Sequence, residues 1–458
     1  MESAAQSEYK EFIYRYLLQI IGIPLQSKKT IDDIILDVDK YVPSSGYVFD
    51  APDEKRVYFA DYSDVLFYVE SKADIDNDNI NAAVNIVQVF FTISKYRHKG
   101  SKASTRINYP SDAMRYRAYE SAVQEGICRW MIGGTNPSTA KLVHTLENWS
   151  VKTYEGKKVT FAFIIDPDGQ SSFSKNDLGS WLGFLDSDYS ATLTDCIHSA
   201  IMLDNNCDFL GYISLSKGNA FPQYSLGRLP YRFAGIIRNH VIGKCVGIFL
   251  LNNGDILLSK RGELRFVKRN LRWLNVSFTA FNNSIKEHIM DTTLIENIYS
   301  TVLDVSFAHT GGIVSVVNDI TELTKKGDEI LNDADYLLNG KSISELKQSK
   351  NVNNLPEDEV KRILLKRAAI SAMISNVNFS NLDRKLRTEL VSMDGACILD
   401  LAGNICAAGA IIKNDSGSSE GGRGAAAKKL SEFGIAIKIS TDGYIEIYRD
   451  REIVFSIK

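Results

Sequence analysis

The residues best suited to chemistry lie near the end of the chain, where a carboxylate and a guanidinium stand among glycines. Asp394 opens the sequence Asp-Gly-Ala and precedes an apolar run, residues 397–401, which predicts a strand. A carboxylate at the mouth of a strand can hold a divalent metal ion. Further along, Arg423 stands in Gly-Gly-Arg-Gly, where it can make forked contacts to phosphate oxygens. These residues predict a site for a phosphate-bearing ligand and a metal ion.

The elements expected around Arg423 suit a phosphate for a second reason. Residues 414–424 are rich in serine and glycine, which predicts a loop, and an alanine-rich helix is expected over residues 425–433. The start of a helix presents free backbone N–H groups and the positive end of the helix dipole. Glycines also let the backbone approach a ligand closely, and those concerned are Gly421, Gly422 and Gly424. Glycine spacing alone is more typical of an ordinary surface loop, and an aspartate before a glycine is more typical of a hairpin turn. The order of the elements therefore decides between these readings and a ligand site.

That order is specific. In sequence it consists of Asp394-Gly395-Ala396, a strand (397–401), a turn (402–404), a second apolar run (405–412), the Gly–Arg loop, the helix, and a strand pair (435–440 and 444–448) around Thr441-Asp442-Gly443. With its Ile-Ser-x-x-Gly-x-Ile ending, the segment resembles the diadenylate cyclase (DAC) domain, the nucleotide-binding domain of the DNA-integrity scanning protein DisA. The resemblance implies that residues 286–458 form a DAC-like domain with a central mixed β-sheet flanked by helices.

The resemblance also implies roles for the two motifs. In the family the aspartate of Asp-Gly-Ala helps to bind Mg²⁺ or Mn²⁺ and to activate the ribose 3′-hydroxyl of ATP, which is the role implied for Asp394. A Gly-Thr-Arg-His-Arg loop holds the phosphates; here Arg423 matches its first arginine, whereas Gly424 and Ala425 replace the histidine and the second arginine. Ser440 falls at the serine of the family's Val-Ser-Glu-Glu stretch. The nucleotide-binding residues so implied are Gly395, Ala396, Gly421, Gly422, Arg423, Gly424 and Ser440.

Half of this signature is intact, which leaves three functions open. The first is a nucleotide-binding sensor or regulatory protein that holds ATP or an adenine-containing second messenger without chemistry. The second is an active diadenylate cyclase, a nucleotidyltransferase that condenses two ATP into cyclic di-AMP, with Lys428 or Lys429 substituting for the lost cations. The third is an interaction domain with a disused pocket. The family's two-domain catalysis implies a homo-oligomer, at least a dimer, and by analogy a place in bacterial nucleotide signalling, including phage defence.

Composition sets broader limits. A chain of 458 residues should form two or three domains, and a net charge of −3 gives no strong signal for nucleic-acid binding. The six cysteines contain no Cys-x-x-Cys pair, which favours a reducing cytoplasm. The polar start predicts no signal peptide, and the apolar run over residues 12–25 is too short to cross a bilayer.

The first two thirds carry no comparable motif and predict a mixed α+β, or α/β, protein. We expect a helical and mixed α/β region over residues 1–150 and a mixed α/β region with a β-meander over residues 151–285. The acidic residues 74–78 could suggest a calcium loop but favour a solvated turn and helix cap. The meander, residues 250–275, carries six cations that could meet phosphates but are more typical of a solvated sheet edge: Lys260, Arg261, Arg265, Lys268, Arg269 and Arg272.

Overall fold

The computed structural model confirms a mixed fold of helices and sheets and divides the chain into two compact units. The first unit comprises residues 1–222 and 231–283, and the second comprises residues 223–230 and 284–456. The structure describes residues 4–23, 48–51, 56–61, 64–70, 73–98, 111–133, 138–169, 191–214, 227–325, 356–374, 377–412 and 421–458. Most of the predicted loop over residues 414–424 therefore lies outside the described residues. Within them, no helix combines the length and apolar content needed to cross a membrane.

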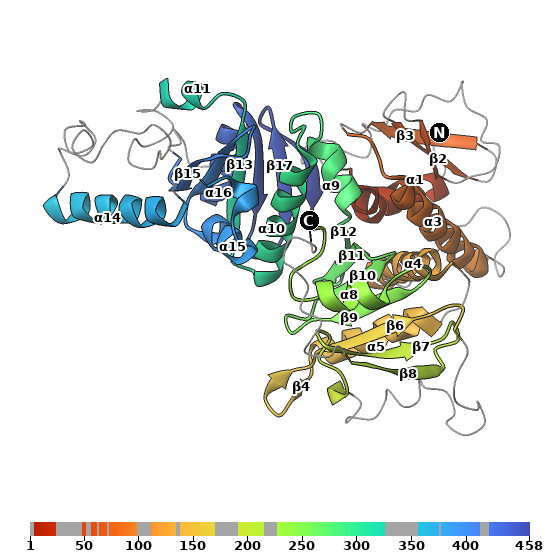
Figure 1. The fold of residues 1–458 in the computed structure, drawn as a ribbon. Coiled ribbons are helices and arrows are strands. Elements are labelled where there is room, and N and C mark those ends of the chain that lie inside the picture. The colour runs from red at the N-terminus through yellow and green to blue at the C-terminus, as the bar shows by residue number, and fades with distance from the viewer. Residues whose placement is uncertain are drawn as a thin grey trace. The chain divides into compact units, whose positions relative to one another are not determined.

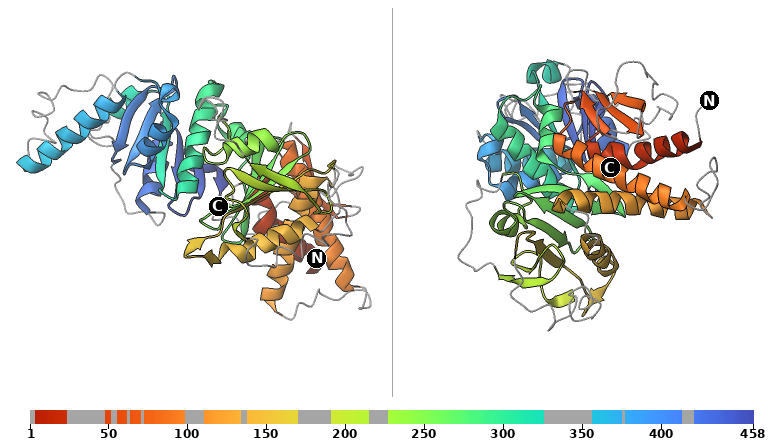
Figure 2. Two further views of the ribbon diagram at one scale, coloured as in Figure 1. Left: turned by 60° about the horizontal axis from the view of Figure 1, so that its bottom comes forward. Right: turned by 90° about the vertical axis from the view of Figure 1, so that its right-hand side faces the viewer.

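Unit 1 begins with helical segments and a small antiparallel sheet of order β1-β2-β3. These first elements are α1 (Ala4–Phe12), the π-helical η1 (Ile13–Leu17), α2 (Leu18–Ile21), β1 (Val48–Ala51), β2 (Arg56–Asp61), β3 (Asp64–Glu70), α3 (Asn77–His98), α4 (Asp112–Ile132) and α5 (Ser138–Ser150). Helices α3 and α4 lie side by side (Figure 1, Figure 2). A Cβ at Gly126 in α4 would be 2.4 Å from the Ile86 Cα, so glycine permits this close packing.

The larger sheet of unit 1 has seven strands in the order β12-β11-β10-β9-β6-β7-β8, with β6 and β7 parallel. The remaining elements of the unit are β4 (Thr153–Tyr154), β5 (Lys157–Lys158), β6 (Phe161–Ile165), β7 (Ser199–Leu203), β8 (Phe209–Ser214), α8 (Ala234–His240), β9 (Val246–Leu250), β10 (Ile256–Lys260), β11 (Glu263–Arg269), β12 (Arg272–Asn275) and α9 (Phe278–Ile285). One apolar cluster contains buried side chains from both residues 1–150 and residues 151–285. The two regions therefore share a core.

The prediction of a solvated edge is wrong for three of the six cations of the meander, whereas Arg261 and Arg272 are exposed as expected. Arg265, Lys268 and Arg269 are buried and paired with acids. The Arg269 Nη2 lies 2.6 Å from the Asp255 carboxylate, and Arg265 contacts a set of three acids, Asp76, Asp78 and Glu263. Buried charges are tolerated when they are paired in this way, so these cations hold the meander to α3, α5 and the neighbouring turn.

One of those acids, Asp76, belongs to the acidic residues 74–78, which could suggest a calcium loop. Asp76 accepts a hydrogen bond from the Asp78 backbone N–H at the start of α3, as a helix cap does. It is buried against Arg265 and Ser277. Burial raises the pKa of Asp76 in spite of the hydrogen bond and the nearby arginine. The expectation of a helix cap agrees with this contact, whereas the expectation of a solvated turn is wrong for Asp76.

Unit 2 is built on a six-stranded sheet of order β15-β14-β13-β16-β17-β18. Strands β13 and β14 are parallel, while β13–β16, β14–β15 and β16–β17 are antiparallel pairs, so the sheet is mixed. Its elements are α10 (Thr292–Ala308), β13 (Gly312–Val317), α11 (Ile320–Lys325), α14 (Glu357–Ile374), η6 (Phe379–Asn381), α15 (Arg384–Ser392), β14 (Ala396–Asp400), β15 (Ile405–Ala410), α16 (Gly421–Leu430), β16 (Gly434–Ile439), β17 (Ile445–Arg449) and β18 (Glu452–Ile457).

Helices cover the sheet of unit 2 because its strands are apolar on both faces. Helix α16 packs through Ala426, Ala427 and Leu430 onto a cluster that includes Ile313 and Ala436. Helices α10 and α15 pack against each other and also contact the sheet. Arg384 on α15 is buried and forms an ion pair with Asp304 on α10, with Nε 2.6 Å from the carboxylate. A mixed sheet flanked by helices, the architecture that the resemblance implies, is thus present in residues 284–456.

Candidate functional site

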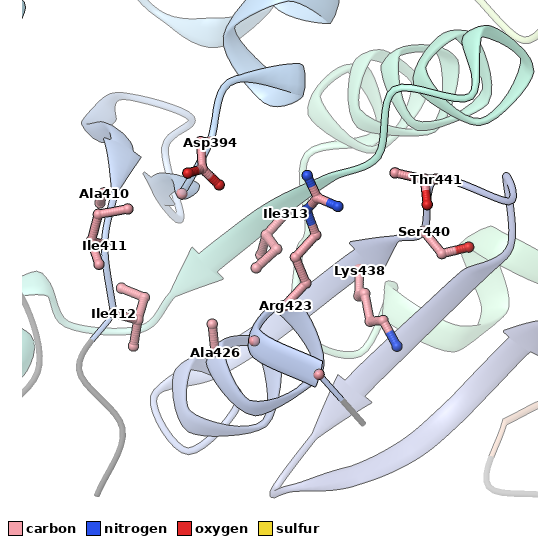
Figure 3. Close-up of a pocket in the computed structure, with 13 residues that line it drawn as sticks. Ile313, Asp394, Ala410, Ile411, Ile412, Arg423, Ala426, Lys438, Ser440 and Thr441 are labelled. Atoms are coloured by element: carbon pink, nitrogen blue, oxygen red, sulfur yellow. The ribbon is translucent and has the colours of Figure 1, made fainter. Parts of the chain in front are cut away.

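A cavity of about 610 Å³ opens beside the sheet of unit 2, and it is within the size range of small-molecule sites. Its lining comes from the starts of β13, β14 and α16 and from the ends of β15 and β16 (Figure 3). The lining residues are Ile313, Asp394, Gly395, Ala410, Ile411, Ile412, Gly421, Gly422, Arg423, Ala426, Lys438, Ser440 and Thr441. Six of the eight residues selected from the sequence are therefore in one cavity. The other two, Ala396 and Gly424, are buried next to it and do not line it.

Strand alternation explains why these side chains meet. Successive side chains of a strand point to opposite faces of the sheet, so residues two apart share a face. Ala396 and Ala436 belong to the cluster under α16, which puts Asp394 and Lys438 on the same side as that helix. The apolar neighbours of Lys438, Ile437 and Ile439, point to the other face.

Asp394 reaches the cavity because Gly395 lets β14 approach β15 unusually closely. Gly395 has a φ of +103°, and a Cβ there would lie 2.5 Å from the Gly409 carbonyl carbon and 2.7 Å from the Ala410 nitrogen. Only glycine tolerates this conformation and contact without movement of the strands. The Asp394 side chain is exposed, and among the described residues no group forms a hydrogen bond or ion pair with its carboxylate. That carboxylate is available to a ligand or a metal ion.

Arg423 lies in the first turn of α16, which begins at Gly421 rather than at Ala425 as expected. The predicted loop boundary is therefore wrong: the glycines favour a loop by propensity, but burial of Gly424 at the helix start outweighs that preference. Gly421, Gly422 and Arg423 of this first turn line the cavity, and the first N–H groups of a helix have no partner within the helix. An anion there would be stabilised by the dipole of α16.

Gly311 makes room for the Arg423 guanidinium. Gly311 has a φ of +71°, and a Cβ at this position would lie 3.1 Å from the Arg423 Nη1 and 3.2 Å from the Ile439 carbonyl oxygen. In Figure 3 the guanidinium and the Asp394 carboxylate lie at the same end of the cavity. No ion pair between them is formed, so both remain able to contact a ligand.

The side of the cavity formed by the end of β16 is polar. It consists of Lys438, Ser440 and Thr441, and only Ser440 was selected from the sequence. The Ser440 Oγ accepts a hydrogen bond of 3.1 Å from the Tyr444 backbone N–H, which closes the turn into β17. Sequence reasoning missed Lys438, although a lysine between two isoleucines at an inward position is an available signal. The proposed substitutes, Lys428 and Lys429, do not line the cavity.

The opposite side is apolar and is formed by Ile411, Ile412 and Ala410 from β15 and the residues after it, with Ile313 and Ala426 between the two sides (Figure 3). Ile411 is 52% exposed, which is unusual for so large an apolar side chain. An apolar wall facing a row of polar and cationic groups fits a ligand that has a flat apolar part and an anionic part.

Among the described residues, the lining of the cavity offers a metal ion one carboxylate. Asp394 is the acidic member of the lining, and the described residues contain no group of three or more His, Cys, Asp or Glu side chains placed to hold a metal. One carboxylate fits Mg²⁺ or Mn²⁺ that arrives with a nucleotide, because such ions are commonly held by one or two carboxylates together with phosphates and water.

Comparison with protein-family models and with curated protein sequences gives no match for this chain.

Proposed function

We propose that unit 2 is a nucleotide-binding domain and that the protein is a sensor or regulator responding to ATP or to an adenine-containing second messenger such as cyclic di-AMP. One observation carries the proposal: Asp394, Arg423 and the start of α16 face the same cavity as an apolar isoleucine wall. Phosphates would contact the guanidinium and the first-turn N–H groups. The base would pack on the apolar wall, and Asp394 would hold Mg²⁺ or Mn²⁺ bound to the phosphates.

The alternative is an active diadenylate cyclase, and the free Asp394 carboxylate is the observation that favours it. In that reaction the aspartate and its metal ion would lower the pKa of a ribose 3′-hydroxyl for attack on the α-phosphate of a second ATP, with pyrophosphate leaving. Two domains would have to face each other, so this function requires a dimer. Gly424 and Ala425 offer no cation for the leaving group, and losing such a group typically costs about 10²-fold or more in rate. We therefore rank sensing above catalysis.

The first experiment separates the two functions. Purified protein is incubated with ATP and Mg²⁺ or Mn²⁺ and analysed by mass spectrometry, while ATP and cyclic di-AMP are titrated by calorimetry. Saturable binding without product supports a sensor. Cyclic di-AMP or another adenylate product that Asp394→Asn abolishes supports the cyclase, and light scattering should then show a dimer. Neither product nor binding would overturn both and leave a disused pocket.

Arg423→Ala tests whether the cavity is the binding site. Loss of a charge-assisted hydrogen bond to phosphate should weaken ATP binding by about 10- to 100-fold and leave adenosine binding nearly unchanged. Arg362→Ala is the matched control, because Arg362 lies on α14 with its side chain 82% exposed and outside the cavity lining. Equal losses for ATP and adenosine would mean that Arg423 only supports the fold.

A further inference from the structure

Lys438 is a cation of the cavity that no motif in the sequence indicates. It projects from β16 on the face covered by α16, and its side chain is only 16% exposed. Long charged side chains usually keep their charge in open water, so a lysine held this deeply beside a cavity calls for a reason.

Lys438 is held in place by a buried acid. Its Nζ donates a hydrogen bond of 2.7 Å to Glu446, the residue directly opposite it on β17. The same carboxylate accepts a hydrogen bond of 2.9 Å from the Tyr448 hydroxyl and lies 3.3 Å from the Lys458 Nζ. Burial raises the pKa of Glu446, but the hydrogen bond from Lys438 and the charges of both lysines outweigh burial and leave this pKa below its ordinary value.

This arrangement leaves Lys438 with unused capacity. An ammonium group has three N–H donors, and among the described residues the contact with Glu446 uses one of them. Among the described residues, the side chains of this cluster supply one carboxylate for two ammonium groups, so these side chains carry a net positive charge. A fixed ammonium in a net positive cluster is prepared to bind an anion, because its position is already set before the ligand arrives.

Lys438 and Arg423 do not point to the same place. Arg423 extends to the end of the cavity where Asp394 lies, and its guanidinium contacts Gly311. Figure 3 shows the Lys438 side chain extending in the opposite direction, along the side where α16 begins. The two cations therefore face different parts of the cavity, an arrangement that suits a ligand with two anionic groups.

We propose that Lys438 is the second anion-binding residue of the cavity and that it makes the site selective for nucleotides with two or more phosphate groups over nucleoside monophosphates. This inference rests on the proposed nucleotide-binding function and names the ligand class that the site prefers. Lys438 lies on β16 and lines the cavity, whereas Lys428 and Lys429 lie on α16 outside the cavity lining.

A purely structural role makes a different prediction. If the Lys438–Glu446 contact only joined β16 to β17, its loss would lower stability and affect all ligands alike. Lys438→Gln and the conservative Lys438→Arg are therefore compared with Lys429→Gln. That control removes a similar lysine–glutamate pair, with the Lys429 Nζ 3.2 Å from Glu432, on the same unit but outside the cavity lining. Thermal denaturation of each variant measures the cost in stability separately.

The test is calorimetric titration of the full-length protein with adenosine, AMP, ADP, ATP and inorganic tripolyphosphate. The wild type should bind ADP and ATP about 10-fold or more tightly than AMP, as expected for one further charge-assisted contact. Lys438→Gln should remove most of that difference while AMP affinity stays the same, Lys438→Arg should keep it, and Lys429→Gln should not change it.

Each other outcome has a definite meaning. If Lys438→Gln changes all affinities equally or not at all, or if the wild type binds AMP as tightly as ATP, the inference is wrong. If no nucleotide binds but tripolyphosphate binds in a Lys438-dependent manner, the proposed nucleotide function fails and the anion-binding role of Lys438 stands. If neither nucleotides nor tripolyphosphate bind, both fail.

Discussion

Gly395→Ala is the most informative single substitution in unit 2, because it tests the contact that brings Asp394 to the cavity. The φ of +103° at this position is unfavourable for alanine, at a cost of about 1–2 kcal/mol. The new Cβ would also lie 2.5 Å from the Gly409 carbonyl carbon and 2.7 Å from the Ala410 nitrogen, which are backbone atoms that cannot rotate away. Overpacking of this kind costs about 1–3 kcal/mol. We therefore expect unit 2 to lose about 2–5 kcal/mol of unfolding free energy.

Gly421→Ala is the matched control. Gly421 also lines the cavity with a positive φ, of +76°, but a Cβ there would meet nothing within 4 Å. This variant should lose only the conformational cost of about 1–2 kcal/mol. The difference in unfolding free energy between Gly395→Ala and Gly421→Ala therefore measures the cost of the close contact between β14 and β15.

The assay can follow each unit separately. All four tryptophans, Trp130, Trp149, Trp181 and Trp273, precede residue 284, so tryptophan fluorescence reports on unit 1. Hydrogen exchange of peptides from β14 and β15 reports on unit 2. Gly395→Ala should speed exchange in these strands and weaken metal-dependent nucleotide binding, with the fluorescence transition unchanged. Equal hydrogen-exchange protection of β14 and β15 in Gly395→Ala and Gly421→Ala would refute the close contact at Gly395. It would also refute the positioning of Asp394 that depends on this contact.

Three further predictions test other parts of the structure. Asp255→Ala should destabilise unit 1 by about 3–5 kcal/mol in a fluorescence-monitored denaturation, because it removes the carboxylate that forms an ion pair with the buried Arg269. Replacement of the partly exposed Glu432 by alanine should cost at most about 1 kcal/mol. The pKa of Glu446 is below its ordinary value of 4.5, so the ionised carboxylate stabilises unit 2 above that pH and this stabilisation is lost on acidification. Glu446→Gln should therefore lower the stability of unit 2 at pH 7. The difference in hydrogen-exchange protection between this variant and the wild type should shrink below about pH 4.5. Burial raises the pKa of Cys245, but this thiol is only partly buried, whereas the other five are buried. Mass spectrometry after native alkylation should therefore find Cys245 modified first, and faster as pH rises.

The site was predictable to the extent that it depends on local order along the chain. Asp394 and Arg423 follow from motifs, and β14 and β16 are visible in the sequence as apolar runs. Their meeting in one cavity depends on the sheet order, which places β13 between the two strands. That order cannot be derived from periodicity; the resemblance of the segment to a known domain supplied the expectation of a mixed sheet.

The features that sequence reasoning missed depend on contacts between distant residues. Arg265 is buried because Asp76, far earlier in the chain, lies beside it, and Lys268 is paired with Glu147. Without knowledge of those partners, a row of cations predicts a solvated edge. The earlier start of α16 has the same kind of cause, because packing of the helix on the sheet overrides the weak helix propensity of its glycines.

The distribution of positive charge in the cavity bears on the choice between sensing and catalysis. In the family that the segment resembles, the motif arginine matched by Arg423 is followed by two further cations, where Gly424 and Ala425 stand here. The other cation of this cavity, Lys438, comes from the facing strand and is fixed by Glu446. A fixed cation accelerates chemistry only where it lies at the charge that develops in the reaction, and Gly424 and Ala425 supply no cation at the positions that the family motif uses for this purpose. Under the proposed function, the described lining supplies groups that would hold a nucleotide, whereas Gly424 and Ala425 supply no cation for a leaving group, and this difference favours a receptor over an enzyme.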